Sequence, residues 1–226
     1  MKKPTPKLKF AVLAADTALF TFENKELLVR LIKVDRPPYY ANHWGLPGGL
    51  IDPKETADRA AWRHLWGKGG VKNAYLEQLY TFSGIHRDPR GRVVAVAYLG
   101  LGQEAKLKYK KDSDQKYEAC WFSVKELPHL AYDHAEVIKF AFERLKSKLT
   151  YTNIAFTLMP KRFTLTELQN LYETILHKRL DRRNFRKKIL SLRILLPVKE
   201  ELRGLANRPA ALYRFKSDKL KLVEII

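Results

Sequence analysis

The chain has 226 residues, of which 46% are hydrophobic, so it can bury a hydrophobic core and is not an intrinsically disordered protein. Its 43 Lys and Arg against 24 Asp and Glu give a net charge of +19, which favours polyanionic partners such as nucleic acid or an anionic membrane surface. The single cysteine, Cys120, excludes an internal disulfide framework and fits a protein of the reducing cytoplasm.

The N-terminal part of the chain predicts two paired strands. A basic start, residues 1–9, precedes an apolar run over residues 10–22, which resembles a signal peptide only superficially because Asp16 interrupts it. The run is too short to span a membrane, and no longer apolar stretch follows, so we expect no membrane segment. We expect instead a strand that pairs, through a turn at residues 23–25, with a second strand over residues 26–34.

The middle of the chain predicts a mixed α and β structure. A loop with Pro37, Pro38 and the glycine-rich run up to Gly49 precedes a helix over residues 56–66, which is closed by glycines. Later residues predict strands at 76–83, 93–101 and 117–124, then a helix over 133–149 with Ile138, Ala141, Leu145 and Leu149 on one stripe. We expect Asp133 and Glu136 to cap the start of this helix.

The charge pattern predicts two domains. Residues 151–226 hold 17 Lys and Arg against 7 Asp and Glu, whereas the preceding 150 residues hold 26 against 17. We therefore expect a first domain over residues 1–149, which includes the helix at about 133–149 as a linker, and a more basic second domain over residues 150–226.

The segment from Gly49 to Val71 follows a known spacing. The residues Gly49, Glu55, Arg63, Leu65, Gly70 and Val71 occupy six positions of the pattern G-x5-E-x7-R-E-U-x-E-E-x-G-U, in which U is aliphatic. Together with the lead-in Trp44-Gly-Leu-Pro-Gly48, the segment resembles the signature of the Nudix superfamily of hydrolases.

The three remaining positions of this pattern, which should be glutamates, are His64, Gly67 and Lys68. On a helix these positions share one face, where three carboxylates would hold Mg²⁺ to clamp a diphosphate and activate water. Here the same face offers an imidazole, a hydrogen and an ammonium group. We therefore expect no metal site and no catalytic residue, while Glu55 and Arg63 form an ion pair that holds the loop on the helix.

Two functions remain open for a pocket of this kind. One is a sensor that binds a phosphorylated or nucleotide-like ligand without cleaving it. The other is a residual hydrolase that uses carboxylates from elsewhere in the chain, such as Glu77 or Glu104.

Several arginines are candidates for contact with a ligand phosphate, because a guanidinium group suits bidentate phosphate binding. Three follow one another in the turn 85–92, which Pro89 and Gly91 predict to be a hairpin, and Trp44 would either stack on a base or plug the core. The complete set of candidate effector-binding residues is Arg36, Trp44, Gly48, Gly49, Arg63, Arg87, Arg90 and Arg92.

The C-terminal part predicts a helix-turn-helix. Thr164 and Glu167 form a capping-box pattern before a helix, and Asp181 is a candidate N-cap for a second helix that keeps Phe185 and Ile189 on its core face. The other faces of that helix are basic at its start, and the stretch 195–215, with two prolines and a glycine, suits a wing. The candidate DNA-binding residues are Thr164, Arg182, Arg183, Asn184, Arg186, Lys187 and Arg208.

Taken together, four motifs resemble the NrtR family of Nudix-related transcriptional regulators. They are the turn Arg87-Asp-Pro-Arg-Gly91, the helix start Tyr132-Asp-His-Ala-Glu136, and the segments Phe163-Thr-Leu-Thr-Glu-Leu-Gln169 and Asp181-Arg-Arg-Asn-Phe-Arg-Lys187. The resemblance implies an α+β chain, with a Nudix-like α/β/α sandwich followed by a winged helix-turn-helix domain.

The resemblance also implies a function. It implies a homodimer that binds palindromic double-stranded operators, usually as a repressor of genes of NAD metabolism, with ADP-ribose as effector and no required cofactor. Two alternatives stay open: a regulator of the same family that responds to a pentose such as arabinose, and an active hydrolase of ADP-ribose or a nucleotide sugar. An RNA-binding adaptor is less favoured because the sequence shows no strand motif with stacking aromatics.

Overall fold

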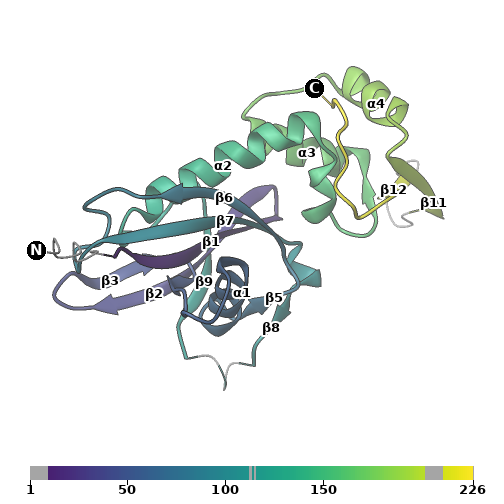
Figure 1. The fold of residues 1–226 in the computed structure, drawn as a ribbon. Helices are drawn as coiled ribbons and strands as arrows, with labels where there is room; N and C mark the ends of the chain where they lie inside the picture. The colour runs from purple at the N-terminus through teal and green to yellow at the C-terminus, as the bar shows by residue number, and fades with distance from the viewer. Residues whose placement is uncertain (1–9, 112–113, 115, 202–210, 226) are drawn as a thin grey trace, which may run out of the picture.

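A computed structural model describes residues 10–111, 114, 116–201 and 211–225 of the chain (Figure 1). Its elements follow the order β1 (Val12–Glu23), β2 (Glu26–Arg36), β3 (Tyr40–Gly45), β4 (Gly48–Leu50), α1 (Ala57–Gly67), β5 (Val71–Lys72), β6 (Tyr75–Phe82), β7 (Val93–Leu101), η1 (Glu104–Lys106), β8 (Lys108–Tyr109), β9 (Ala119–Ser123), α2 (His134–Tyr151), η3 (Ile154–Thr157), β10 (Phe163–Thr164), α3 (Leu165–Leu176), α4 (Arg182–Ser191), β11 (Leu195–Glu201) and β12 (Ala211–Phe215). No helix in these ranges is long and apolar enough to cross a membrane.

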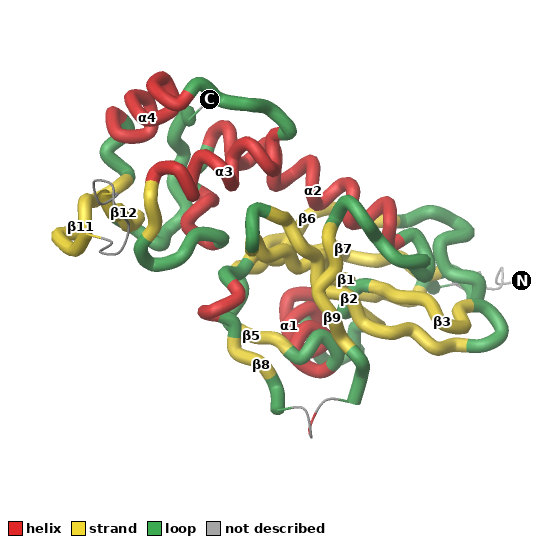
Figure 2. Tube along the Cα trace, turned by 180° about the vertical axis from the view of Figure 1, so that it is seen from behind, coloured by secondary structure: helices red, strands yellow, loops and turns green. Residues whose placement is uncertain are grey.

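The first domain is a mixed sheet between two helices. The strands lie in the order β3-β2-β1-β7-β6, with β1 and β7 parallel, while β4 pairs with β1 and β9 with β2. Helices α1 and α2 lie on opposite sides of this sheet (Figures 1 and 2). Alternate residues of β1 therefore face different helices: Ala15 packs with Ala60 and Ala61 of α1, whereas Phe20 belongs to the core beneath α2. The expected α/β/α sandwich is confirmed.

The predicted pairing of the first two strands is correct, with Phe20 opposite Val29. Asn24 and Lys25 connect the strands with φ angles of 48° and 64°, which are typical of a tight hairpin turn. The loop expected up to Gly49 was only partly correct, because it contains β3 and β4. Strand β3 lies at the edge of the sheet, and its sequence Tyr-Ala-Asn-His-Trp-Gly lacks the hydrophobic alternation on which the prediction relied.

Helix α2 connects the two parts of the molecule. The predicted stripe is buried, and it joins one continuous core that extends from the sheet to Leu168 and Leu171 of α3. The expected domain boundary after residue 149 falls in the last turn of this helix, and it stays a prediction. Asp133 is the N-cap residue and Glu136 lies in the first turn, as expected, but the Asp133 carboxylate makes no capping bond and instead accepts hydrogen bonds from Arg87.

The second part of the chain is a small three-stranded sheet, in the order β10-β12-β11, with helices α3 and α4. Thr164 and Glu167 form the predicted capping box at α3, and Asp181 caps α4 by accepting a hydrogen bond from the Asn184 amide at 2.8 Å. The helices are joined by residues 177–181, and β11 with β12 forms the wing, so the predicted winged helix-turn-helix is confirmed.

Candidate functional site

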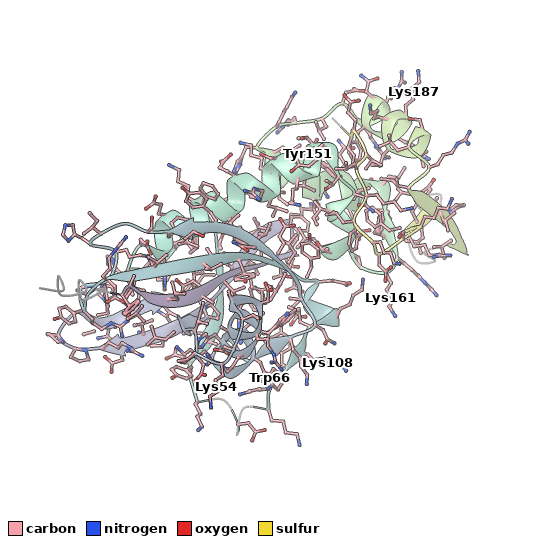
Figure 3. All side chains as sticks on the ribbon, viewed as in Figure 1. Lys54, Trp66, Lys108, Tyr151, Lys161 and Lys187 are labelled. Carbon is pink, nitrogen blue, oxygen red and sulfur yellow. The ribbon has the colours of Figure 1, made fainter. Side chains whose placement is uncertain are left out.

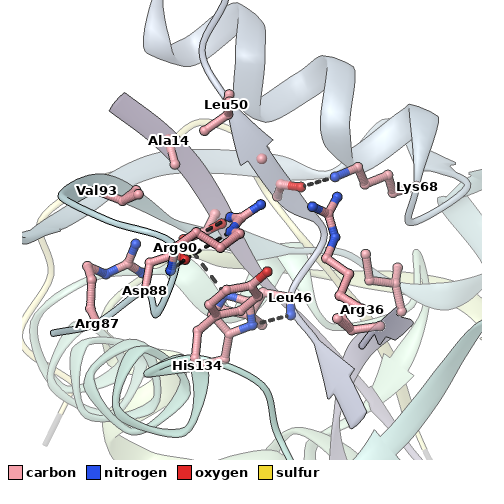
Figure 4. Close-up of a pocket in the computed structure, with 16 residues that line it drawn as sticks. Ala14, Arg36, Leu46, Leu50, Lys68, Arg87, Asp88, Arg90, Val93 and His134 are labelled. Carbon is pink, nitrogen blue, oxygen red and sulfur yellow. Dashed lines mark hydrogen bonds and ion pairs between the residues drawn. The ribbon is translucent and has the colours of Figure 1, made fainter. Parts of the chain in front are cut away.

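A cavity of about 170 Å³ opens between β1, the end of α1, the turn after residue 84 and the start of α2 (Figure 4). Its lining carries four cationic side chains against two carboxylates, Asp16 and Asp88. The cations are Arg36, Lys68, Arg87 and Arg90. An excess of positive charge in a concave site favours an anionic ligand.

The preserved part of the Nudix box has a structural task. The Arg63 guanidinium donates to both oxygens of Glu55 and to the backbone carbonyl of Leu50, at 3.0 Å. These hydrogen bonds from Arg63 lower the pKa of Glu55 to about 2. Glu55 also accepts from the Asp52 amide at 2.9 Å. The expected ion pair is confirmed, and it lies outside the lining of the cavity.

The altered face of the box is closed by hydrogen bonds. His64 Nε2 lies 2.9 Å from the carbonyl oxygen of Leu50, and Lys68 Nζ donates to the carbonyl oxygen of Gly48 at 2.5 Å. A carbonyl cannot donate, so the His64 proton lies on Nε2. A side chain at Gly67 would enter open space. Burial lowers the pKa of both His64 and Lys68.

This donor set does not fit the divalent cation that Nudix hydrolases use. The Lys68 ammonium lies against a carbonyl oxygen and would repel a metal ion, and Gly67 supplies no ligand. Over the whole described part of the chain, no three His, Cys, Asp or Glu side chains lie together as a metal site would require. Neither Glu77 nor Glu104 lines the cavity; Glu77 forms an ion pair with Lys148 at 2.9 Å.

A buried network forms the base of the cavity. Arg87 donates to both carboxylate oxygens of Asp133, at 2.8 and 2.6 Å, and to Asp16 at 3.3 Å. The Leu46 amide donates to His134 Nδ1 at 3.0 Å, which leaves Nε2 to carry a proton 3.8 Å from Asp16. Burial raises the pKa of Asp16, but the nearby Nε2–H of His134 and the charge and hydrogen bond of Arg87 outweigh it, so the pKa is lowered.

The mouth of the cavity contains more accessible cations. Arg90 donates to both oxygens of Asp88, at 2.9 and 2.6 Å, and its guanidinium carbon lies 5.7 Å from the ring centre of Tyr132. Its side chain keeps 42% of its surface exposed. Arg36 also faces the cavity (Figure 4), and no carboxylate within the described ranges pairs with it.

The cavity brings together five of the eight predicted effector-binding residues. Three lie elsewhere: Arg63 is in the ion pair with Glu55, Arg92 donates to the carbonyls of Ser83 and Gly84, and Trp44 packs against Phe122 with ring centres 4.7 Å apart. The five that line it are Arg36, Gly48, Gly49, Arg87 and Arg90.

Four polar residues that line the cavity were not predicted from the sequence as site residues. Asp16 had been noted only because it breaks an apolar run, although a buried carboxylate in a central strand is itself a signal of a site. It also explains Gly48, because any side chain there would overlap the Asp16 carboxylate. The other three are Asp88, Tyr132 and His134.

A second candidate site lies on the surface of α4. Phe185 and Ile189 are buried, and the Phe185 ring centre lies 5.4 Å from that of Tyr172 on α3. This contact turns the predicted basic residues outward, and Lys187 extends from the far end of the molecule (Figure 3). The exposed set is Arg182, Arg183, Asn184, Arg186 and Lys187.

Two predicted DNA-binding residues differ from this set. The Thr164 hydroxyl is held in the capping box, where it accepts from the Glu167 amide at 3.1 Å and donates to the Glu167 carboxylate at 2.9 Å. Arg208 lies outside the described residues.

Comparisons with known proteins cover both sites. The model of the NUDIX domain matches residues 12–141, and that of the NrtR DNA-binding winged helix domain matches residues 155–215. The ADPR responsive transcriptional repressor NtrR of Acinetobacter baylyi is 33% identical over 208 residues, which are 90% of this chain and 82% of that protein. An ADP-ribose pyrophosphatase of Methanocaldococcus jannaschii is 32% identical over 117 residues, which cover 51% of this chain and 66% of that enzyme.

Solved structures agree with the sequence matches. The crystal structure of Shewanella oneidensis NrtR with a 27mer DNA has a TM-score of 0.77 at 32% identity and covers 90% of this chain and 93% of that one. The NUDIX domain of the same protein, solved with ADP ribose, has a TM-score of 0.50 at 32% identity, covering 63% of this chain and 94% of that domain. The chain therefore belongs to the NrtR family, whose members join a Nudix domain to a DNA-binding winged helix.

Proposed function

We propose that the chain is a transcriptional repressor that holds operator DNA with its winged helix and releases it when ADP-ribose binds the Nudix cavity. The observation that carries this proposal is the first turn of α4, which contains arginines and no acidic residue. Cations at a helix N-terminus oppose the helix dipole, and the single Asp181 carboxylate at the N-cap offsets only part of this effect. A polyanion along this face removes that disadvantage, which supports DNA as the partner.

The side chains of α4 suit contacts with both the base edges and the backbone phosphates of DNA. Arg183 and Arg186 are long enough to reach guanine edges in the major groove, and Asn184 can read adenine. Lys187 and Arg182 would neutralise backbone phosphates. Thr164 would act by positioning, because its hydroxyl holds the start of α3. We also propose that two copies of the chain bind a palindromic operator, since one recognition helix reads only one half-site. We place this binding in the cytoplasm.

In the cavity, we assign the diphosphate of ADP-ribose to three cations of the lining. Arg36 is the first choice, with Lys68 beside it and Arg90 after exchange of its bond to Asp88. Arg87 is a positioning residue, because Asp16 and Asp133 already occupy its donors.

We propose that the chain does not hydrolyse its ligand. In place of the metal-binding glutamates, His64 and Lys68 donate to the carbonyls of Leu50 and Gly48. The similarity of the first domain to an ADP-ribose pyrophosphatase supports the choice of ligand rather than the reaction.

A pentose is the second candidate effector, because the cavity volume of about 170 Å³ is smaller than that of most nucleotide-sized sites. A thermal-shift titration with ADP-ribose, NAD and arabinose separates the two. A ligand that binds the folded state stabilises it, by about 2.7 kcal/mol at 100 times its Kd, and therefore raises its melting temperature. ADP-ribose should stabilise the native chain and have a weaker effect on Arg36→Ala. If arabinose stabilised the chain and ADP-ribose did not, a pentose would replace ADP-ribose as the proposed effector.

A further inference from the structure

A groove of about 420 Å³ lies where the first domain meets the winged helix. Lys106 of η1 contributes from the first domain, and the other lining residues come from the segment before β10 and from the end of β12. In the view of Figure 3, Lys161 lies on the side of the winged helix nearest the first domain, away from Lys187 of α4. The groove is thus separate from both sites described above.

The groove gathers cations that form no ion pair with the described residues. Lys106, Lys161, Arg214 and Lys216 line it with a single carboxylate, Asp218. None of these four side chains forms an ion pair within the residues that the structure describes. Burial, and then repulsion from Lys161, lower the pKa of Lys106. In the Nudix cavity, by contrast, Arg87 and Arg90 are paired with carboxylates.

The remaining lining is apolar and partly aromatic. Phe156 and Phe215 lie with their ring centres 6.4 Å apart, and Pro160 completes this side of the groove. Apolar walls with a few converging charges are the usual composition of a small-molecule site, and the volume falls within the usual range for one.

We propose that this groove binds the phosphate groups of a nucleoside diphosphate or triphosphate, with its ring moiety against the phenylalanines. Four cations beside one carboxylate repel one another, and a di- or triphosphate relieves that repulsion through charge-assisted hydrogen bonds. A concave groove between two domains suits a small ligand better than a duplex, which needs a long accessible face. Because both domains contribute to the groove, a ligand there would join them.

The test is a calorimetric titration of ADP into the full chain that is already saturated with ADP-ribose, so that the Nudix cavity is filled. The variants are Lys106→Glu and Lys161→Glu. The matched control is Lys108→Glu, which makes the same charge change at an exposed residue two positions from Lys106 and outside the groove. Loss of one charge-assisted bond and the added repulsion should weaken ADP binding at least about tenfold in both variants and less than about twofold in the control.

Three outcomes would overturn the proposal. Equal weakening in Lys106→Glu and Lys108→Glu would mean that general charge attraction holds ADP. Loss of ADP binding in Arg36→Ala but not in Lys106→Glu would place ADP in the Nudix cavity. Weaker binding of a duplex by Lys106→Glu, with ADP binding unchanged, would assign the groove to the DNA backbone. Each result is independent of whether ADP-ribose controls operator binding.

Discussion

The Nudix cavity and the surface of α4 are both rich in arginine, but they differ in how far carboxylates neutralise the arginine charges. In the cavity, Arg87 is only 4% exposed and is held by two carboxylates. On α4, the basic side chains are exposed, and no ion pair of the described residues involves them. The number of arginines alone therefore does not identify a binding surface. What matters is whether the protein already supplies the counter-charge.

The largest effect is expected from Arg87→Ala. Removing this guanidinium leaves Asp16 and Asp133 facing each other without a counter-charge, and breaking a buried pair in this way costs about 3–5 kcal/mol. Urea titration should show a loss of unfolding free energy of that size. Arg92→Ala is the control, because Arg92 is exposed and, among the described residues, its side chain bonds to two backbone carbonyls and to no carboxylate. Equal losses in the two variants would show that the Arg87 network has no special structural role.

The corresponding change on α4 should act on binding instead of stability. Arg183→Ala or Arg186→Ala should each weaken operator binding by about 1–3 kcal/mol if the arginine pairs with a base, with the unfolding free energy nearly unchanged. Fluorescence anisotropy with labelled operator measures this, and Lys54→Ala, an exposed lysine of the first domain, is the control. If Lys54→Ala weakens operator binding as much as the α4 variants do, the basic surface of α4 has no specific role in operator binding.

The contrast between the α4 surface and the cavity also explains how much of each could be predicted from the sequence. The capping box at Thr164, the cap at Asp181 and the basic face of α4 are local features, so spacing within one helix was sufficient. The partners of Arg87 lie 46 and 71 residues away in the chain, and no local pattern indicates them. For this reason Arg87 was grouped with the ligand-binding arginines, and Asp16 was assigned no role in the cavity. Strand β3 was not predicted because its hydrogen bonds with β2 define it, and its sequence has no apolar alternation.

Thr164→Ala should have a smaller effect, of about 1 kcal/mol on the unfolding free energy, because the capping box at α3 loses its side-chain acceptor. Thr166→Ala is the matched control: Thr166 is exposed inside the same helix, where alanine is a better helix former. Operator affinity should change little in either variant. A large loss of affinity with unchanged stability in Thr164→Ala would instead mean that the hydroxyl contacts DNA.

The smallest effect is expected from pH. The folded-state pKa of Asp16 is lowered below 3.8, so its contribution to stability is present above that value and is lost as pH falls through the lower folded pKa. Urea titrations between pH 7 and pH 3 should show a loss of unfolding free energy that begins below about pH 4. Stability that rises over the same interval would contradict the proposed role of Asp16 as a paired carboxylate.

We propose that this Nudix domain binds ADP-ribose without hydrolysing it and that this binding lowers the affinity of the winged helix for the operator. The most direct measurement mixes the full chain, labelled operator, ADP-ribose and Mg²⁺, and then follows operator anisotropy and AMP formation in the same sample. We expect operator affinity to fall by about 5- to 150-fold, the usual range of allosteric coupling, with ADP-ribose recovered intact. AMP formed at about one turnover per second or faster, or an operator affinity that ignores ADP-ribose, would contradict it.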